Sequence, residues 1–390
     1  YLVNLNIICI IDFLSFITMK NSKTEKVNEL LEEVVQLKQK LEEVRSRFID
    51  TNISGFVNKN KVKLLSNPPK LINIHLLRAH HSRIHDVRWS LKGDYLLSVG
   101  SDNSLIIWDA IRGLIYNLVD CSSQQPITAD ISEDLESLYV GGLCANVTLF
   151  TQKQDKTEMY ESYVIKSTYE HQSNVSNIRC FKNELLTTDE AENINYWDVE
   201  KVKIKQTISN RATISSLEII NPPSVILTGG SDGLIKLWDR RSKNPLQSIY
   251  DGHESDVTCL SVASNSKTFF SGSDDTFFHM YDLRLDTPLA RYGAAVWRDV
   301  DMTKEAIEHG DRPQPASIAS LAVSPSARIV FTGCRDNNIY VWDTCNPTDP
   351  IKSYDEQGPV TKMVFNESKT GLAVVTWDIK NRLRIMRPQK

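Results

Sequence analysis

The chain has 390 residues, of which 24% are charged and 41% hydrophobic, so it can bury a large apolar core. Its formal net charge of −4 argues against a general binder of nucleic-acid backbones, which would usually be basic. Its seven cysteines are odd in number and form no C-x-x-C pair, which argues against a disulfide framework or zinc site and favours a reducing cytosol.

Residues 1–18 form an apolar lead that fits no standard targeting segment. The chain begins with Tyr1, and its first methionine is Met19. The stretch Leu2–Ile17 is interrupted by two asparagines and an aspartate, and it lacks the basic start of a signal peptide. We expect translation to begin at Met19 and residues 1–18 to be non-native or untranslated. A signal anchor is the alternative.

Residues 19–51 carry the pattern of a coiled-coil helix. Ser22-Lys23-Thr24-Glu25 is a capping box at its start. Apolar residues then recur at alternating steps of three and four, which is typical of a heptad seam: Val27, Leu30, Val34, Leu37, Leu41, Val44 and Phe48. Because an isolated helix of this length is marginal in water, the seam needs a partner helix, a second copy or the protein's own folded domain. Residues 52–69 are expected to be an irregular connector.

The stretch Gly252–Arg284 predicts one unit of a repeated β structure. It opens with Gly-His and continues with strands at Val257–Val262, Thr268–Ser271 and Phe277–Tyr281. A tight turn at Ser273–Asp275 precedes the third strand, which closes on an aromatic-Asp pair. This order of parts is that of a WD-repeat blade.

Closing aromatic residues recur through residues 70–390 at intervals of roughly 40 to 47 residues, with one longer interval. They are Trp108, Phe150, Trp197, Trp238, Tyr281 and Trp342, followed by a degenerate copy at Leu383–Met386. The sequence therefore predicts an all-β, seven-bladed propeller over residues 70–390. Lys70–Leu77 is expected to supply the outer strand of the seventh blade. The long interval predicts an insertion at about 297–314.

The better preserved repeats share a set of polar residues that we expect to be buried and structural rather than a Ser-His-Asp triad. Buried polar groups left unpaired cost about 1–3 kcal/mol each, so such a set survives or decays together. The sets are His80, Ser98, Asp102 and Trp108 in the first blade, Asp232 and Trp238 in the fourth, and His253, Ser271 and Asp275 in the fifth. Asn210 replaces the histidine of the fourth blade, and Ala191 falls at the turn of the third. No catalytic or metal-ligand spacing appears, so we expect neither an enzyme nor a cofactor.

A capped heptad helix before a seven-bladed WD ring resembles the β subunit of heterotrimeric G proteins. The most specific match is the spacing of GHESD, GSDD and DLR within Gly252–Arg284. The resemblance implies a non-enzymatic transducer that forms an obligate dimer with a γ subunit through the seam Val27–Phe48. It also implies that the narrow face of the propeller binds a GDP-bound α subunit and effectors. The dimer would lie in the cytoplasm, held at the inner face of the plasma membrane by the lipidated γ subunit.

The resemblance also implies contact residues for the α subunit and effectors: Arg83, Ile106, Ile127, Leu143, Asp256, Asp274 and Trp377. Four positions depart from the family. Gln125 stands where the family has Trp, His85 and Asn174 where it has Tyr, and Thr213 where it has Asp. Large aromatic residues are the usual anchors of interfaces, so we expect a changed affinity for the α subunit.

The sequence leaves two alternatives open. The charges of Arg83, Asp256 and Asp274 fit solvated loops as well as a partner surface. The function could also be that of a WD-repeat scaffold unrelated to G proteins, which self-associates through its helix. A propeller enzyme would need a cluster of acids or metal ligands at the channel mouth, and the sequence offers none.

Overall fold

The computed structural model describes residues 61–65, 70–121, 125–132, 135–152, 163–181, 184–220, 224–293, 317–356, 358–366, 371–376 and 382–389, with the single positions 36 and 57. The chain divides into two compact units, residues 1–61 and 62–390, and nearly all described residues fall in the second. The lead 1–18, the seam Val27–Phe48, most of the connector and the insertion 297–314 lie outside the described residues.

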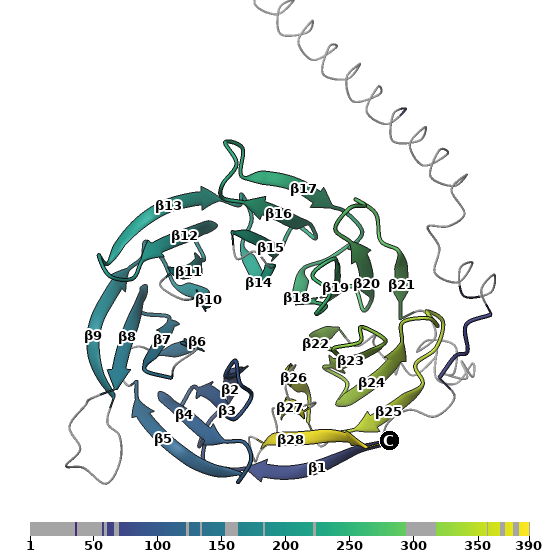
Figure 1. Ribbon diagram of the computed structural model, residues 1–390, viewed down its shortest axis with the longest axis horizontal. Helices are drawn as coiled ribbons and strands as arrows, with labels where there is room; N and C mark the ends of the chain where they lie inside the picture. Colours follow the sequence, from purple (N-terminus) through teal and green to yellow (C-terminus); the bar gives the residue numbers. More distant parts are fainter. Residues whose placement is uncertain are drawn as a thin grey trace, which may run out of the picture. The chain divides into compact units, whose positions relative to one another are not determined.

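The described strands form seven antiparallel sheets of four strands each, arranged around a central axis (Figure 1). Blade 1 contains β2 (Ile84–Trp89), β3 (Tyr95–Gly100), β4 (Ser104–Asp109) and β5 (Leu114–Asp120). Blade 2 contains β6 (Pro126–Ile131), β7 (Ser137–Gly142), β8 (Asn146–Gln152) and β9 (Tyr163–Glu170). Blade 3 contains β10 (Val175–Phe181), β11 (Glu184–Asp189), β12 (Asn193–Asp198) and β13 (Lys203–Ser209).

Blade 4 contains β14 (Ile214–Ile220), β15 (Val225–Gly230), β16 (Ile235–Asp239) and β17 (Leu246–Tyr250). Blade 5 contains β18 (Val257–Val262), β19 (Thr268–Ser273), β20 (Phe278–Asp282) and β21 (Ala290–Tyr292). Blade 6 contains β22 (Ile318–Val323), β23 (Ile329–Cys334), β24 (Asn338–Asp343) and β25 (Lys352–Asp355). Blade 7 contains β26 (Val360–Asn366), β27 (Gly371–Thr376), β28 (Arg382–Gln389) and β1 (Lys70–Leu77). The predicted seven-bladed propeller is confirmed.

The ring is closed by strands from both ends of the propeller sequence. β1 pairs antiparallel with β28, with Lys70 opposite Gln389 and Leu77 opposite Leu383. Figure 1 shows this outer strand beside the last strand of the chain. This pairing joins the two ends of the ring, and radial repetition of the blades leaves only short, protected sheet edges. The predicted place of Lys70–Leu77 is therefore confirmed.

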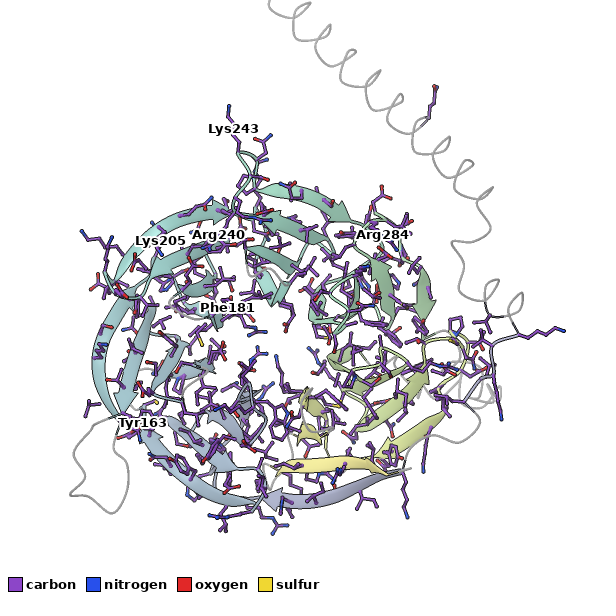
Figure 2. The ribbon with its side chains drawn as sticks, in the orientation of Figure 1. Tyr163, Phe181, Lys205, Arg240, Lys243 and Arg284 are labelled. Carbon is purple, nitrogen blue, oxygen red and sulfur yellow. The ribbon has the colours of Figure 1, made fainter. Side chains whose placement is uncertain are left out.

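The hydrophobic core consists of apolar side chains packed between the faces of neighbouring blades. Strand side chains alternate, so each blade presents apolar residues to the next. Leu77 and Leu383 of blade 7 pack in one cluster with Val87 and Trp108 of blade 1. The side chains that radiate from the outer strands and turns include charged tips such as Lys243 and Arg284 (Figure 2).

The fifth blade differs slightly from the predicted boundaries. β19 extends to Ser273, and β20 begins at Phe278. The turn between them is therefore Asp274–Phe277, with Thr276 at a positive φ of 75°. The backbone N–H of Ser273 donates to the carbonyl of Phe277 at 3.2 Å, which continues the ladder past Ser271.

Candidate functional site

Each inner strand carries a β-bulge near its start. The register shifts between the first and third residues of all seven: β2, β6, β10, β14, β18, β22 and β26. A bulge re-aims side chains, and here it occurs where the inner strands begin. We call this end of the ring the mouth face. It is the face on which partner contacts were predicted.

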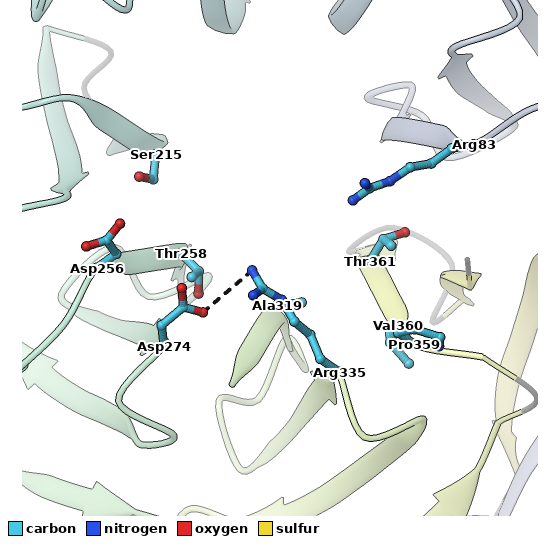
Figure 3. Close-up of a pocket in the computed structure, with 10 residues that line it drawn as sticks. All are labelled: Arg83, Ser215, Asp256, Thr258, Asp274, Ala319, Arg335, Pro359, Val360 and Thr361. Carbon is cyan, nitrogen blue, oxygen red and sulfur yellow. Dashed lines mark ion pairs between the residues drawn. The ribbon is translucent and has the colours of Figure 1, made fainter. Parts of the chain in front are cut away.

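A cavity of about 600 Å³ occupies the centre of the mouth face (Figure 3). Its lining comes from blades 1, 4, 5, 6 and 7: Arg83, Ser215, Asp256, Thr258, Asp274, Ala319, Arg335, Pro359, Val360 and Thr361. The structure thus brings three predicted contact residues, Arg83, Asp256 and Asp274, to one cavity. Arg83 and Asp256 are exposed, and Asp274 is half-buried.

The cavity holds charges of both signs. The backbone N–H of Asp274 donates to the carbonyl of Asp256 at 3.1 Å, which keeps these two acidic residues adjacent. Arg335 Nη2 lies 3.6 Å from Asp274 Oδ1, a buried oxygen that accepts no hydrogen bond (Figure 3). This ion pair is therefore loose, and a better donor would improve it. Mixed charges around an open mouth suit a protein surface better than a small apolar ligand.

The positions that depart from the G-protein β pattern lie around the same mouth and are engaged in local hydrogen bonds. His85 Nε2 is 2.6 Å from Ser101 Oγ. Asn174 donates to Glu190 at 2.9 Å, and Thr213 donates to Ser231 at 2.7 Å. Polar side chains tied down in this way offer less apolar area than the family's Trp and Tyr residues. The mouth face of this chain is accordingly more polar than the family pattern.

Gln125 has a backbone role of its own. Its φ is 44°, and its carbonyl lies against Gly142, where an added Cβ would come within 2.0 Å of that oxygen. The neighbouring Leu143 is 49% exposed, and its N–H donates to the Gln125 carbonyl at 3.2 Å. Ile127 is half-buried at the second position of β6. Leu143 and Ile127 therefore both remain available on the side of blade 2.

One predicted contact residue does not fit a partner surface. Ile106 is 0% exposed and packs between blades 7 and 1 with Val87, Ala373 and Ile385. Its place in β4 turns the side chain into the sheet interface, so it presents no surface to a partner. Trp377 and the seam residues Val27, Leu30, Val34, Leu37, Leu41, Val44 and Phe48 lie outside the described residues.

The polar set of blade 1 forms as predicted. His80 Nδ1 lies 3.0 Å from Asp102 Oδ2, and His80 Nε2 lies 2.8 Å from Ser98 Oγ. The Trp108 indole N–H donates to Ser98 Oγ at 2.8 Å. Burial lowers the pKa of His80, with Asp102 opposing the fall, so its neutral form, with Nδ1–H donating to Asp102, fits the site. The set ties the mouth-face turn to the third strand of the blade.

Blades 5, 4 and 3 each keep only some of the residues that form this set in blade 1. In blade 5, His253 lies 2.8 Å from Asp275 and 2.7 Å from Ser271. Burial would raise the pKa of Asp275, but its contacts with His253 outweigh this effect and lower the pKa to about 2.

In blade 4, Lys236 replaces the missing histidine as the partner of the turn aspartate. Its ammonium donates to Asp232 at 2.7 Å and to the Asn210 carbonyl at 2.9 Å, while Trp238 donates to Thr228 at 2.9 Å. In blade 3, where Ala191 occupies the turn, Asp189 Oδ2 lies 3.9 Å from His171 Nδ1, and His171 Nε2 has no hydrogen-bond partner. These contacts support the structural interpretation of the sets.

A second group of charges lies deeper in the channel. Arg88, Asp130, Arg179 and Glu218 are each the fifth residue of their inner strands, in blades 1 to 4. Arg179 donates to Glu218 at 2.8 Å, and Arg88 Nη1 lies 3.9 Å from Glu218. Two further residues complete the channel cluster: Asp86 lies 3.4 Å from Arg88 and 3.5 Å from Lys362.

The channel cluster contains three acids and three bases, so its charges balance. Burial raises the pKa of Asp130, with Arg179 and Arg88 opposing the rise. Burial lowers the pKa of Lys362, with Asp86 opposing the fall. These contacts join the inner strands of blades 7, 1, 3 and 4, and the Asp130 carboxylate also accepts from the backbone N–H of Cys180 at 2.7 Å. The cluster is a brace across the channel.

Sequence reasoning missed Arg335 and the channel cluster. Arg335 stands after Gly333 and Cys334 as Asp274 stands after Gly272 and Ser273, so aligning the repeats would have placed it on the mouth. The same alignment places the four strand charges at one position. The described residues contain no group of three or more His, Cys, Asp or Glu that could hold a metal ion. Among the described residues, no helix is both long and apolar enough to cross a membrane.

The fold and its repeats make this chain a seven-bladed WD-repeat β-propeller. The repeat described as "WD domain, G-beta repeat" matches residues 72–109, 203–239, 244–282 and 309–343. The match at 72–109 starts in β1 and ends in β4, so the sequence repeat is offset from the structural blade by one strand. Because of this offset, the first strand of the first repeat belongs to blade 7, and its pairing with β28 closes the ring.

Among curated proteins, the chain is similar to G-protein β subunits. The guanine nucleotide-binding protein subunit beta of Solanum tuberosum is 25% identical over 325 residues, covering 80% of this chain and 82% of that protein. The one of Saccharomyces cerevisiae is 25% identical over 398 residues, covering 93% and 90%. Among solved structures, the crystal structure of RRP9 WD40 repeats has a TM-score of 0.66 at 18% identity, covering 82% of this chain and 99% of that one. That likeness supports the fold alone.

Proposed function

We propose that this chain is a divergent β subunit of a heterotrimeric G protein. The observation that carries the proposal is the length of the match to β subunits. Residues 62–390 make up less than 85% of the chain, so a match over 93% extends into the segment before the propeller. A generic WD scaffold would share the propeller without sharing that segment.

In this function the chain binds and releases partners and performs no chemistry. The seam Val27–Phe48 pairs with a γ-subunit helix, and the γ lipid holds the dimer at the inner face of the plasma membrane. The mouth face binds the GDP-bound α subunit or an effector, and the two exclude each other because they use one surface.

The mouth cavity supplies the chemistry of that surface. Asp256 and Asp274 offer carboxylates, Arg83 and Arg335 offer guanidinium groups, and Ile127 and Leu143 add apolar area on blade 2. Charge pairs of this kind govern association rate and partner choice more than affinity. With the family's aromatic anchors absent at Gln125, His85 and Asn174, we expect weaker binding of a typical α subunit.

Co-expression with a panel of γ subunits tests the proposal. We expect a soluble one-to-one dimer with at least one γ subunit, measured by size-exclusion chromatography with light scattering. Replacing both Leu37→Asp and Leu41→Asp should abolish pairing because it places charges in the apolar seam. Gln39→Asp, which lies off the seam, is the matched control.

The scaffold function makes the opposite prediction. It requires a stable homodimer without any γ subunit, held together by the same seam. A homodimer that persists in the presence of every γ subunit would refute the proposal and support the scaffold.

A further inference from the structure

Exposed apolar side chains of the described residues concentrate on blades 7 and 1. Of seventeen large ones, nine lie on β1, on β5 and on the β2–β3 and β4–β5 turns: Ile72, Ile74, Leu76, Leu91, Ile111, Leu114, Ile115, Tyr116 and Leu118. The highest exposed fractions are 69% for Leu91, 64% for Ile111 and 61% for Leu114. Single exposed apolar residues are ordinary, but a contiguous group marks an interaction site.

Contacts between the elements show that this group is contiguous. His75 Nε2 on β1 is 3.0 Å from the carbonyl of Ile111. A Cβ added to Gly113 would come within 2.5 Å of the His75 ring, so β1 and the start of β5 touch. The backbone N–H of Ala110 donates to the carbonyl of Asp94 at 2.9 Å, which joins the turn of Ile111 to the turn after Leu91.

The three most exposed residues lie at the end of blade 1 opposite the mouth face. Inner strands begin at the mouth and the sheets are antiparallel, so the turns β2–β3 and β4–β5 lie at the far end. Leu91 is on the first of these turns and Ile111 on the second, with Leu114 at the start of β5. We call these three residues the corner patch.

Basic side chains border the corner patch. Lys92 and Arg112 directly follow Leu91 and Ile111, and both are exposed. Arg112 is 77% exposed and 3.7 Å from Asp109, so its guanidinium still faces solvent. Arg387, also exposed, lines a recess of about 470 Å³ together with Ile74 and Ile111. This basic border stands out in a chain of net charge −4.

We propose that the corner patch binds an anionic lipid surface. Leu91, Ile111 and Leu114 enter the boundary between headgroups and acyl chains, while Lys92, Arg112 and Arg387 bind lipid phosphates. Apolar tips with basic neighbours are the chemistry of interfacial membrane binding. Turns that project from a corner can all reach one flat surface. The mouth face then points away from the bilayer and stays open to soluble partners.

The proposal does not depend on the G-protein function, and flotation with lipid vesicles tests it. The full chain is mixed with phosphatidylcholine vesicles that contain or lack phosphatidylserine. An unlipidated γ subunit accompanies it if one is needed for expression, so that no lipid anchor contributes. We expect binding to the anionic vesicles only, weakened by added salt.

Two double variants separate the apolar and electrostatic parts. Ile111→Ser with Leu114→Ser should weaken binding by at least about tenfold, because two apolar tips no longer enter the lipid. Lys92→Gln with Arg112→Gln should weaken it by about fivefold per charge. The matched control is Ile204→Ser with Leu246→Ser, near the starts of β13 and β17, at exposed fractions of 48% and 40%. It should bind as the unchanged chain does.

Thermal unfolding of each variant checks that it is folded. We expect all of them to fold, because the altered residues are exposed. Absence of binding by the unchanged chain, or equal binding by the corner variants and the control, would overturn the proposal. A protein interface is the rival. It would appear as self-association without lipid that Ile111→Ser with Leu114→Ser abolishes, and this result would also overturn lipid binding.

Discussion

At the scale of residues, blade 5 contains a buried imidazole that the repeat pattern does not require. His279 is 1% exposed and stacks on His253, with ring centroids 4.1 Å apart and planes at 8°. Its Nδ1 lies 3.1 Å from the Tyr281 hydroxyl, while its Nε2 has no hydrogen-bond partner. Burial, reinforced by His253, lowers the pKa of His279 to about 3. The folded protein therefore holds this ring neutral.

The lowered pKa makes the protein labile to acid. An unfolded chain protonates a histidine below about pH 6.5, whereas folded His279 does not until about pH 3, so stability falls as pH falls through this range. We expect a loss of about 2 kcal/mol between pH 7 and pH 5 from this residue. His279→Phe, which keeps the stacked ring, should remove that part of the pH dependence, measured by urea unfolding.

His81→Phe is the control for this effect, because His81 is exposed. An unchanged pH profile for His279→Phe would show that the buried imidazole does not limit acid stability.

At the scale of elements, the inner strands act as a braced ring rather than seven independent sheets. Arg179 is the centre of this brace, since it donates to the side chain of Glu218 and, at 2.7 Å, to the carbonyl of Leu217. Asp130 of the neighbouring blade 2 is half-buried, and the Arg179 guanidinium opposes the rise in its pKa that burial causes. Arg179 is buried and Glu218 is half-buried, so loss of the guanidinium leaves a carboxylate only partly compensated by solvent.

We therefore expect Arg179→Met to lower the free energy of unfolding by about 3 kcal/mol, measured by urea denaturation. The double variant Arg179→Met with Glu218→Met should recover part of the loss, because the stranded carboxylate is gone. Arg241→Met is the control, since its guanidinium pairs with Asp239 but is 60% exposed. Equal stability of all three variants would contradict the brace.

At the scale of the whole molecule, the insertion 297–314 follows β21 and precedes β22. β21 is the outer strand of blade 5, and β22 begins at the mouth of blade 6. From the sequence, we expect an insertion between these two strands to alter or partly shield the surface proposed for the α subunit. The inserted residues are rich in Asp, Glu, Arg and Lys, so they can compete for the charges of the mouth.

Deleting residues 297–314 should raise the affinity for a GDP-bound α subunit, because a competing segment is removed. Titration calorimetry on the βγ dimer measures the change. Asp256→Ala with Asp274→Ala, made in the same dimer, should lower affinity by removing both cavity carboxylates. An affinity unchanged by the deletion would mean that the insertion does not shield the mouth.

Much of the fold could be read from the sequence because each blade is local. The four strands of a WD unit are joined by short turns, so alternation, turn residues and closing aromatics specify them within some forty residues. The prediction for Lys70–Leu77 was also confirmed. The C-terminal segment provides only three strands of blade 7, and Lys70–Leu77 is the strand-like segment left to provide the fourth. Only strand ends moved, as at β19, where ladder hydrogen bonds extend past the residues with clear alternation.

The site was predictable only in part. Arg83, Asp256 and Asp274 follow from the repeat pattern and from family resemblance, and they meet at one cavity. Ile106 matched the family equally well but is buried, because a sequence match does not say which way a side chain points in a closed ring. The polar set of blade 3 was expected to weaken at Ala191, whereas the partial replacement by Asp189 depends on geometry.

The sequence by itself determined the number of blades, the order of strands and the buried His-Asp-Ser-Trp sets, since all of these are local and repeated. The tertiary structure alone decided what the repeats build together. Closure of the ring brings residues from blades 1, 4, 5, 6 and 7 around one mouth, aligns fifth-position charges across the channel, and joins β1 to β5 at an apolar corner. These sites depend on distances between blades, and no pattern along a single repeat contains them.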